Sequence, residues 1–147
     1  MAATVLTSCA GDPNAGAVNF EGVQSATIQI QAEGTFIEPL TLDPVESGSW
    51  RGSGFFINSS GIAVTNNHVV TGAGTLKVWA GGDQSTTYGA TVLGASECLD
   101  LAVIKVDGDK FPFMAWYEGE IKPALDVYSA GFPLGDPNFT LTKGIVS

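Results

Sequence analysis

The sequence predicts an all-β fold, because short strand-like segments alternate with glycine-rich turns along most of its length. Ala26, Ile28, Ile30 and Ala32 alternate with polar residues, which is the two-residue period of a half-buried strand. No window shows a convincing 3.6-residue period of an amphipathic helix. The 19 glycines among 147 residues suit the bent strands and tight turns of a barrel or sandwich.

The other elements follow in order along the chain. Residues 33–49 are polar and contain Pro39 and Pro44, so we expect an irregular surface loop there. Residues 58–61, Asn-Ser-Ser-Gly, have the residue types of a tight hairpin turn between two strands. The strands predicted after the first are residues 50–57, 62–65, 76–80, 86–94, 101–106, 127–131 and 139–146.

Composition excludes some classes of function. Acidic residues number 15 against 6 basic ones, which gives a net charge of −9. Binding to nucleic acid requires clustered Lys and Arg that displace phosphate counterions, and the sequence has no such cluster. No apolar run approaches the roughly 18 residues that cross a bilayer. We therefore expect a soluble domain with its own core and no nucleic-acid partner.

The two cysteines, Cys9 and Cys98, allow one disulfide but form no disulfide framework. Together with the single histidine they fall short of the four ligands of a zinc site, and no cofactor is expected. Residues 6–10, Leu-Thr-Ser-Cys-Ala, resemble the bacterial lipobox, which implies a membrane tether through a lipidated Cys9. The residues before them lack the charged region and apolar core of a signal peptide, so a tail with an incidental thiol stays an alternative.

The most informative segment contains His68, the only histidine of the chain. Residues 52–57, Gly-Ser-Gly-Phe-Phe-Ile, are followed by a turn and then by residues 61–70, Gly-Ile-Ala-Val-Thr-Asn-Asn-His-Val-Val. A second segment, residues 100–106, begins with Asp100 and continues as a strand of alternating apolar residues. Asp100 lies 32 residues after His68, with two strands predicted between them.

A third segment extends the pattern to the last residue. Residues 128–135 contain the turn Gly-Phe-Pro-Leu-Gly, and residues 141–147 end in Gly-Ile-Val-Ser. In this order the three segments resemble trypsin-like (chymotrypsin-fold) serine proteases, most closely the bacterial high-temperature-requirement or Deg-type branch. The resemblance covers roughly residues 23–147.

This resemblance implies a chymotrypsin-like antiparallel β-barrel. The domain organisation that it implies is a flexible tail at residues 1–20, an N-terminal barrel with the catalytic His and Asp at 21–122, and the truncated start of a second barrel at 123–147. It also implies proteins or peptides as substrates and an exported, periplasmic or extracellular location.

The resemblance gives each of the two residues a role. His68 would take the proton of a catalytic serine and later return it to the leaving amine, a task that suits an imidazole because its pKa lies near neutral pH. Asp100 would accept a hydrogen bond from the other ring nitrogen, fix the tautomer and stabilise the imidazolium. The order His, then Asp, is that of chymotrypsin.

The nucleophile of the family lies in a Gly-Asn/Asp-Ser-Gly-Gly-Pro segment, and no such run occurs in this sequence. We therefore expect the chain alone to be inactive. Three interpretations remain: the N-terminal portion of a serine endopeptidase, a non-catalytic pseudo-protease barrel that acts as a protein-binding module, and a structural barrel with an accidental resemblance. The presence of both His68 and Asp100 favours the first over the second. An incomplete second barrel would expose apolar surface and the strand edge at residues 139–147, so we also expect self-association.

Overall fold

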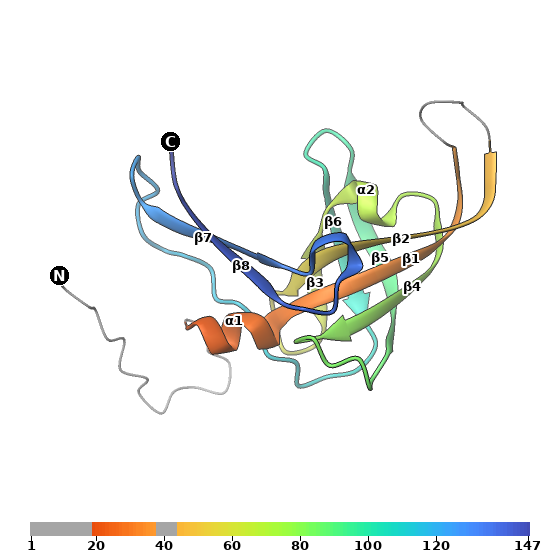
Figure 1. The fold of residues 1–147 in the computed structure, drawn as a ribbon, viewed down its shortest axis with the longest axis horizontal. Helices are drawn as coiled ribbons and strands as arrows, with labels where there is room; N and C mark the ends of the chain where they lie inside the picture. Colours follow the sequence, from red (N-terminus) through yellow and green to blue (C-terminus); the bar gives the residue numbers. More distant parts are fainter. Residues whose placement is uncertain (1–18, 38–43) are drawn as a thin grey trace.

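A closed barrel of six antiparallel strands forms the body of the molecule, in the order β1-β2-β3-β6-β5-β4 (Figure 1). The computed structural model describes residues 19–37 and 44–147. The barrel strands are β1 (Thr27–Ile37), β2 (Pro44–Phe56), β3 (Ile62–Thr65), β4 (Ala73–Ala80), β5 (Tyr88–Ser96) and β6 (Leu101–Val106). A two-stranded sheet of β7 (Asp126–Gly131) and β8 (Thr140–Ile145) lies beside the barrel. The predicted all-β barrel is confirmed.

The described residues also form three short helical segments. Helix α1 (Phe20–Ala26) precedes β1, α2 (Asn67–Val70) lies between β3 and β4, and the 3₁₀ turn η1 (Pro133–Gly135) lies between β7 and β8. Ala26, expected in the first strand, is the last residue of helix α1, and the strand begins at Thr27. The predicted tail at residues 1–20 lies almost wholly outside the described residues and stays a prediction. The Asn19 side chain caps α1 by accepting a hydrogen bond of 2.8 Å from the backbone N–H of Gly22. A helix of 7 residues is too short to show a helical period in the sequence. None of the described helices has the length and apolar character needed to cross a bilayer.

The surface loop predicted at residues 33–49 is wrong at both of its ends. β1 continues to Ile37 and β2 already begins at Pro44, and the pairing of the two strands extends from Glu33 opposite Ser49 to Ile37 opposite Pro44. Pro44 is tolerated because it is the first residue of its strand, where a missing N–H costs least. This stretch carries no regular alternation of apolar residues, so periodicity did not reveal it.

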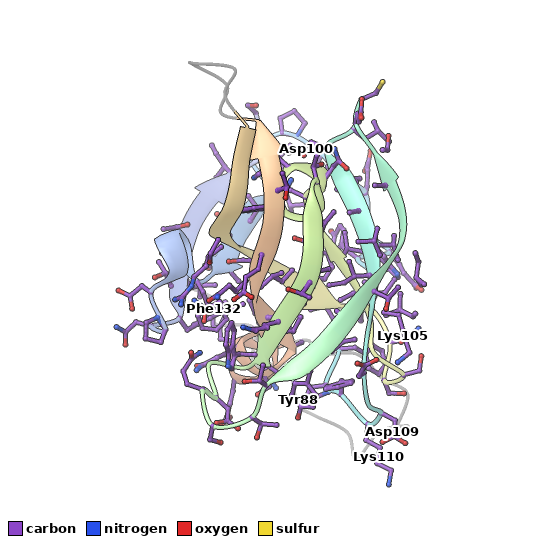
Figure 2. All side chains as sticks on the ribbon, turned by 90° about the vertical axis from the view of Figure 1, so that its right-hand side faces the viewer. Tyr88, Asp100, Lys105, Asp109, Lys110 and Phe132 are labelled. Atoms are coloured by element: carbon purple, nitrogen blue, oxygen red, sulfur yellow. The ribbon has the colours of Figure 1, made fainter. Side chains whose placement is uncertain are left out.

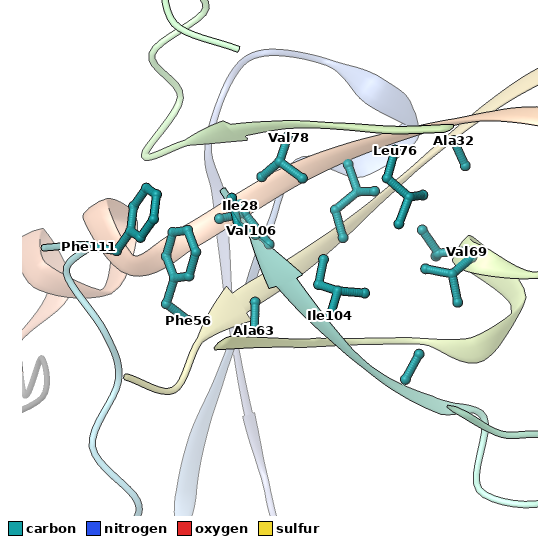
Figure 3. Close-up of a cluster of buried hydrophobic side chains, with 13 residues drawn as sticks. Ile28, Ala32, Phe56, Ala63, Val69, Leu76, Val78, Ile104, Val106 and Phe111 are labelled. Carbon is teal, nitrogen blue, oxygen red and sulfur yellow. The ribbon is translucent and has the colours of Figure 1, made fainter. Parts of the chain in front are cut away.

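The core fills the barrel with the inward-facing residues of its strands (Figure 3). β3 and β6 bury every second residue, as a strand with one face on the core requires. Phe56 closes one end of the core by stacking on Phe111, with ring centroids 4.4 Å apart. The fully buried apolar side chains of this cluster are Ile28, Ile30, Ala32, Phe56, Ala63, Val78, Ile104 and Val106.

The turn after β7 attaches the second sheet to the barrel. Phe132 is buried, and its backbone N–H donates a hydrogen bond of 2.8 Å to Ser53 Oγ of β2. The Arg51 guanidinium donates to the Gly135 carbonyl at 2.9 Å, and the Gln29 amide donates to the Asp136 carbonyl at 3.4 Å. The domain boundary placed between residues 122 and 123 falls in the segment between β6 and β7 and stays a prediction.

Close packing between β2 and β3 makes Gly54 a test of the barrel geometry. A Cβ atom at Gly54 would lie 2.6 Å from the Val64 carbonyl oxygen, a backbone atom that cannot rotate away. We expect Gly54→Ala to destabilise the fold by about 1–3 kcal/mol, the usual range for overpacking. The matched control is Gly94→Ala in β5, because a Cβ there meets no atom within 4 Å. Urea unfolding followed by tryptophan fluorescence measures both changes, and equal midpoints for the two variants would contradict the packing.

Candidate active site

Antiparallel pairing of β3 with β6 brings His68 and Asp100 together. The register places Thr65, the last residue of β3, opposite Ala102 of β6. Partner numbers run in opposite directions in such a pair, so the chain that leaves β3 meets the chain that enters β6. Two residues that are 32 positions apart in the sequence therefore lie at the same end of the barrel. Figure 2 shows Asp100 at this end and Tyr88 at the opposite one.

Helix α2, a single turn, presents the imidazole to solvent. Val69 and Val70 are buried in the barrel core, and the Trp50 indole N–H donates to the Val69 carbonyl at 2.8 Å. The Thr71 hydroxyl donates to the Asn67 carbonyl at 2.8 Å and closes the turn. Because the following two residues are anchored inward, the side chain of His68 points outward and is 70% exposed.

The acid occupies the last position of the turn between β5 and β6. Ser96 pairs with Leu101 across this turn, and the Asp100 N–H donates to the Glu97 carbonyl at 3.2 Å. The φ angle of Asp100 is 49°, in the left-handed region, which Asp adopts more readily than most residues other than glycine. The carboxylate contacts α2 from this position.

Both carboxylate oxygens of Asp100 are bound by His68. Asp100 Oδ2 lies 2.7 Å from His68 Nδ1, and Asp100 Oδ1 accepts a hydrogen bond of 2.9 Å from the His68 backbone N–H. The first distance is typical of a hydrogen bond between an N–H group and an ionised carboxylate. When Nδ1 carries the proton of the neutral ring, Nε2 is left with the lone pair. This arrangement can accept a proton at Nε2 while the carboxylate holds the ring in place.

The pKa of the Asp100 carboxyl is lowered below its usual range. The hydrogen bond from the His68 backbone N–H is the largest cause, and the hydrogen bond from its imidazole comes second. The side-chain amide of Asn66 adds a smaller effect in the same direction. Each of these donors favours the ionised form, so the acid is a carboxylate at neutral pH.

Asn66 is a residue of this site to which the sequence analysis gave no role. Its side-chain Nδ2 donates to the Asp100 backbone oxygen at 3.0 Å and to Asp100 Oδ2 at 3.2 Å. An asparagine between a strand and a histidine is a sequence signal for a turn or a helix cap, and neither points to an acid 34 residues away.

An open groove of about 610 Å³ lies between the barrel and the second sheet, next to the His–Asp pair. It adjoins the pair through Asn66, which contacts Asp100, and through Leu101, which follows it. The wall from the barrel consists of Ser53, Gly54, Phe55, Val64, Thr65, Asn66 and Leu101. The wall from the second sheet and its turn consists of Ser129, Ala130, Gly131, Phe132, Pro133, Thr140 and Thr142.

Of the two cysteines, the structure describes only Cys98, which makes no hydrogen bond with the His–Asp pair. Cys98 is a free, exposed thiol in the turn before Asp100, and Cys9 lies outside the described residues. Within residues 19–37 and 44–147 no group of three or more His, Cys, Asp or Glu side chains is arranged to hold a metal ion.

Comparisons with known proteins point to one class of enzyme. A family model described as "Trypsin-like peptidase domain" matches residues 52–147. The chain is 39% identical over 110 residues to the "Putative serine protease HhoB" of Synechocystis, which covers 74% of this chain and 25% of that protein. It is 36% identical over 97 residues to the "Probable periplasmic serine endoprotease DegP-like" of Marinomonas, covering 65% of this chain and 20% of that protein.

A plant relative gives the same result. The chain is 35% identical over 113 residues to "Protease Do-like 1, chloroplastic" of Arabidopsis thaliana, which covers 75% of this chain and 25% of that protein. In each of these three proteins the match spans a quarter of the length or less.

We expect the pKa of Asp100 to lie below the value of about 3.9 that an unperturbed Asp has. A lowered folded-state pKa stabilises the fold above the unfolded-state value, and this contribution disappears as the pH falls through the folded-state pKa. The stability advantage of the wild-type chain over Asp100→Asn should therefore be constant near neutral pH and decline below about pH 4. Urea unfolding at several pH values measures it.

A ¹³C NMR titration of the Asp100 carboxyl gives the pKa directly. In His68→Ala the backbone donor remains and the ring is lost, so the midpoint should move only part of the way back toward the usual value. A wild-type midpoint at or above the usual value would contradict the arrangement of donors around Asp100.

Proposed function

Because the chain belongs to the trypsin-like peptidase family, we propose that it supplies the general base and the orienting carboxylate of a serine endopeptidase. The observation that supports this most directly is the 2.7 Å contact between His68 Nδ1 and Asp100 Oδ2, with Nε2 directed away from the acid. The relatives are named as serine proteases or endoproteases, which gives the expected substrate class, proteins and peptides.

In the proposed reaction, His68 Nε2 takes the proton of a serine hydroxyl as the serine oxygen attacks the carbonyl carbon of a peptide bond. The proton is then given to the leaving amine, the C–N bond breaks, and the serine carries the acyl group. His68 Nε2 next takes a proton from water as the water oxygen attacks the acyl carbon. The bond between this carbon and the serine oxygen then breaks, the serine oxygen takes the proton from His68, and the acid product leaves. Asp100 stays ionised throughout and stabilises the protonated ring.

The nucleophile in this proposal comes from polypeptide beyond these 147 residues, because no Gly-x-Ser-Gly-Gly run occurs among them. The chain alone is then expected to be inactive as a peptidase. The alternative to an enzyme is a non-catalytic barrel that binds proteins. The paired imidazole and carboxylate favour the enzyme, because binding by a barrel surface requires neither group.

The test uses the protein as its gene encodes it, with all the polypeptide that accompanies this chain. We expect it to hydrolyse fluorescein-labelled casein and to react with a fluorophosphonate probe. Asp100→Asn should lower kcat by about 10⁴, as loss of the orienting carboxylate does in the serine-protease template. His68→Ala should lower kcat by about 10⁶, the scale on which a serine protease loses activity without its general base. Lys77→Ala is the control, because its ion pair with Glu33 lies on the barrel surface in the middle of β4 and β1.

Two results would contradict parts of the proposal. Casein hydrolysis that persists in His68→Ala would show that the His–Asp pair is not catalytic. Casein binding without hydrolysis by the wild-type protein would support the binding module. Turnover by the isolated 147-residue chain that disappears in His68→Ala would overturn its expected inactivity.

We also propose an exported location, because one of the relatives is named a probable periplasmic endoprotease. A lipid tether at Cys9 belongs to this proposal and rests on the lipobox resemblance alone. Cell fractionation should place the wild-type protein with membranes and Cys9→Ser in the soluble exported fraction. Recovery of both from the cytosol would contradict the proposal.

A further inference from the structure

We propose that Asn66 is a positioning residue, which holds Asp100 in its left-handed turn and directs the carboxylate at His68. This inference rests on the proposed function for its catalytic consequence. The positioning itself follows from the contacts between Asn66, Asp100 and His68.

The contact between Asn66 and Asp100 fixes a side chain relative to its own backbone. One nitrogen, Asn66 Nδ2, donates to the backbone oxygen of Asp100 at 3.0 Å and to its Oδ2 at 3.2 Å. Since both acceptors belong to the same residue, the pair of bonds restricts rotation of the carboxylate about the side-chain bonds. Oδ2 is also the oxygen that lies 2.7 Å from His68 Nδ1. The amide therefore orients the very atom that meets the imidazole.

The cap of helix α2 supports the same assignment. Asn66 occupies the N-cap position, where Asn is one of the most favoured residues because its side-chain oxygen can accept a helix N–H. Here the side chain makes no such bond. The His68 backbone N–H, inside the first turn of α2, donates instead to Asp100 Oδ1 at 2.9 Å. The residue at the cap position holds the acid, and the acid takes over the capping of the helix.

The Asp100 carboxylate is exposed to water, so the hydrogen bonds from Asn66 matter for its orientation. The Asp100 side chain is 45% exposed, so water competes for its oxygens. Its backbone is in the left-handed region at φ 49°, which an L-residue adopts at some cost. A donor at the end of β3 stabilises this turn because the pairing of β3 with β6 fixes its place. The donor is a neutral amide, so it stabilises the carboxylate without adding a second positive charge next to the imidazole.

The chain itself provides the first experiment. Asn66→Ala should raise the pKa of Asp100 toward its usual value and weaken the downfield Nδ1–H proton signal of His68, because the carboxylate gains rotational freedom. Asn66→Ser restores a side chain that can cap α2 but is too short to reach both Asp100 atoms. It should show the same two changes, which separates positioning from capping. A ¹³C NMR titration of the Asp100 carboxyl measures the first change, and a ¹H spectrum of the His68 Nδ1–H measures the second.

Two further variants make the result decisive. Asn67→Ala is the matched control, since Asn67 is the same residue type one position later and its side chain makes no hydrogen bond to Asp100; both signals should stay as in the wild type. Asn66→Asp places a second carboxylate beside the first and should raise the pKa of Asp100 further than Asn66→Ala does. Unchanged Asp100 titration and Nδ1–H signal in both Asn66→Ala and Asn66→Ser would overturn the proposal.

The catalytic consequence is measured in the complete gene product. Asn66→Ala is expected to lower kcat by up to about 10²-fold, the scale of a misplaced catalytic group, with KM little changed. Normal kcat in Asn66→Ala, together with lost activity in His68→Ala, would overturn the positioning role and leave the proposed function intact. Activity that persists in His68→Ala would instead contradict the proposed function, whatever the NMR result for Asn66.

Discussion

The register between β3 and β6 is the constraint on which the candidate site depends. With Thr65 opposite Ala102, the end of one strand and the start of the other meet, and the imidazole and the carboxylate come within hydrogen-bonding distance. A shift of one residue would turn the buried face of β6 toward solvent, because successive side chains of a strand point to opposite sides. Burial of Ala102, Ile104 and Val106 therefore fixes the position of Asp100. The hydrophobic core determines the geometry of an exposed polar pair.

The site has little burial of its own and is held by hydrogen bonds to backbone atoms. His68 is anchored by the two buried valines that follow it, and Asp100 by the β5–β6 turn that precedes its strand. These two anchoring segments lie far apart in the sequence. The Asp100 carboxylate links them by accepting a hydrogen bond from the His68 backbone N–H. These backbone anchors hold the pair together at a surface position, where an isolated ion pair contributes little.

The sequence predicted the parts of this structure that a regular pattern encodes. The predicted strands 62–65 and 101–106 have the bounds that the structure shows. In residues 101–106 the apolar residues Ala102, Ile104 and Val106 alternate on the core face, and the turn at residues 58–61 marks the start of the shorter strand. The extension of β1 and β2 toward residues 37 and 44 was missed, since this part of the sequence has no regular alternation of apolar and polar residues. The closeness of Asn66 to Asp100 was also out of reach, because it follows from strand pairing and a left-handed turn rather than from residue spacing.

The attachment of the second sheet determines the width of the groove beside the site. The hydrogen bond from the Phe132 N–H to Ser53 Oγ joins the two walls at one end, and Arg51 and Gln29 reinforce that junction through the backbone of the next turn. Asn66 and Leu101 line the groove where it reaches the His–Asp pair. Helix α1 holds the same sheet at a second place, because the ring of Phe20 contacts the ring of Tyr128 in β7 with centroids 5.0 Å apart. Both attachments lie outside the His–Asp pair, so a substitution at Phe20 or Ser53 can alter the shape of the groove without changing either residue of the pair.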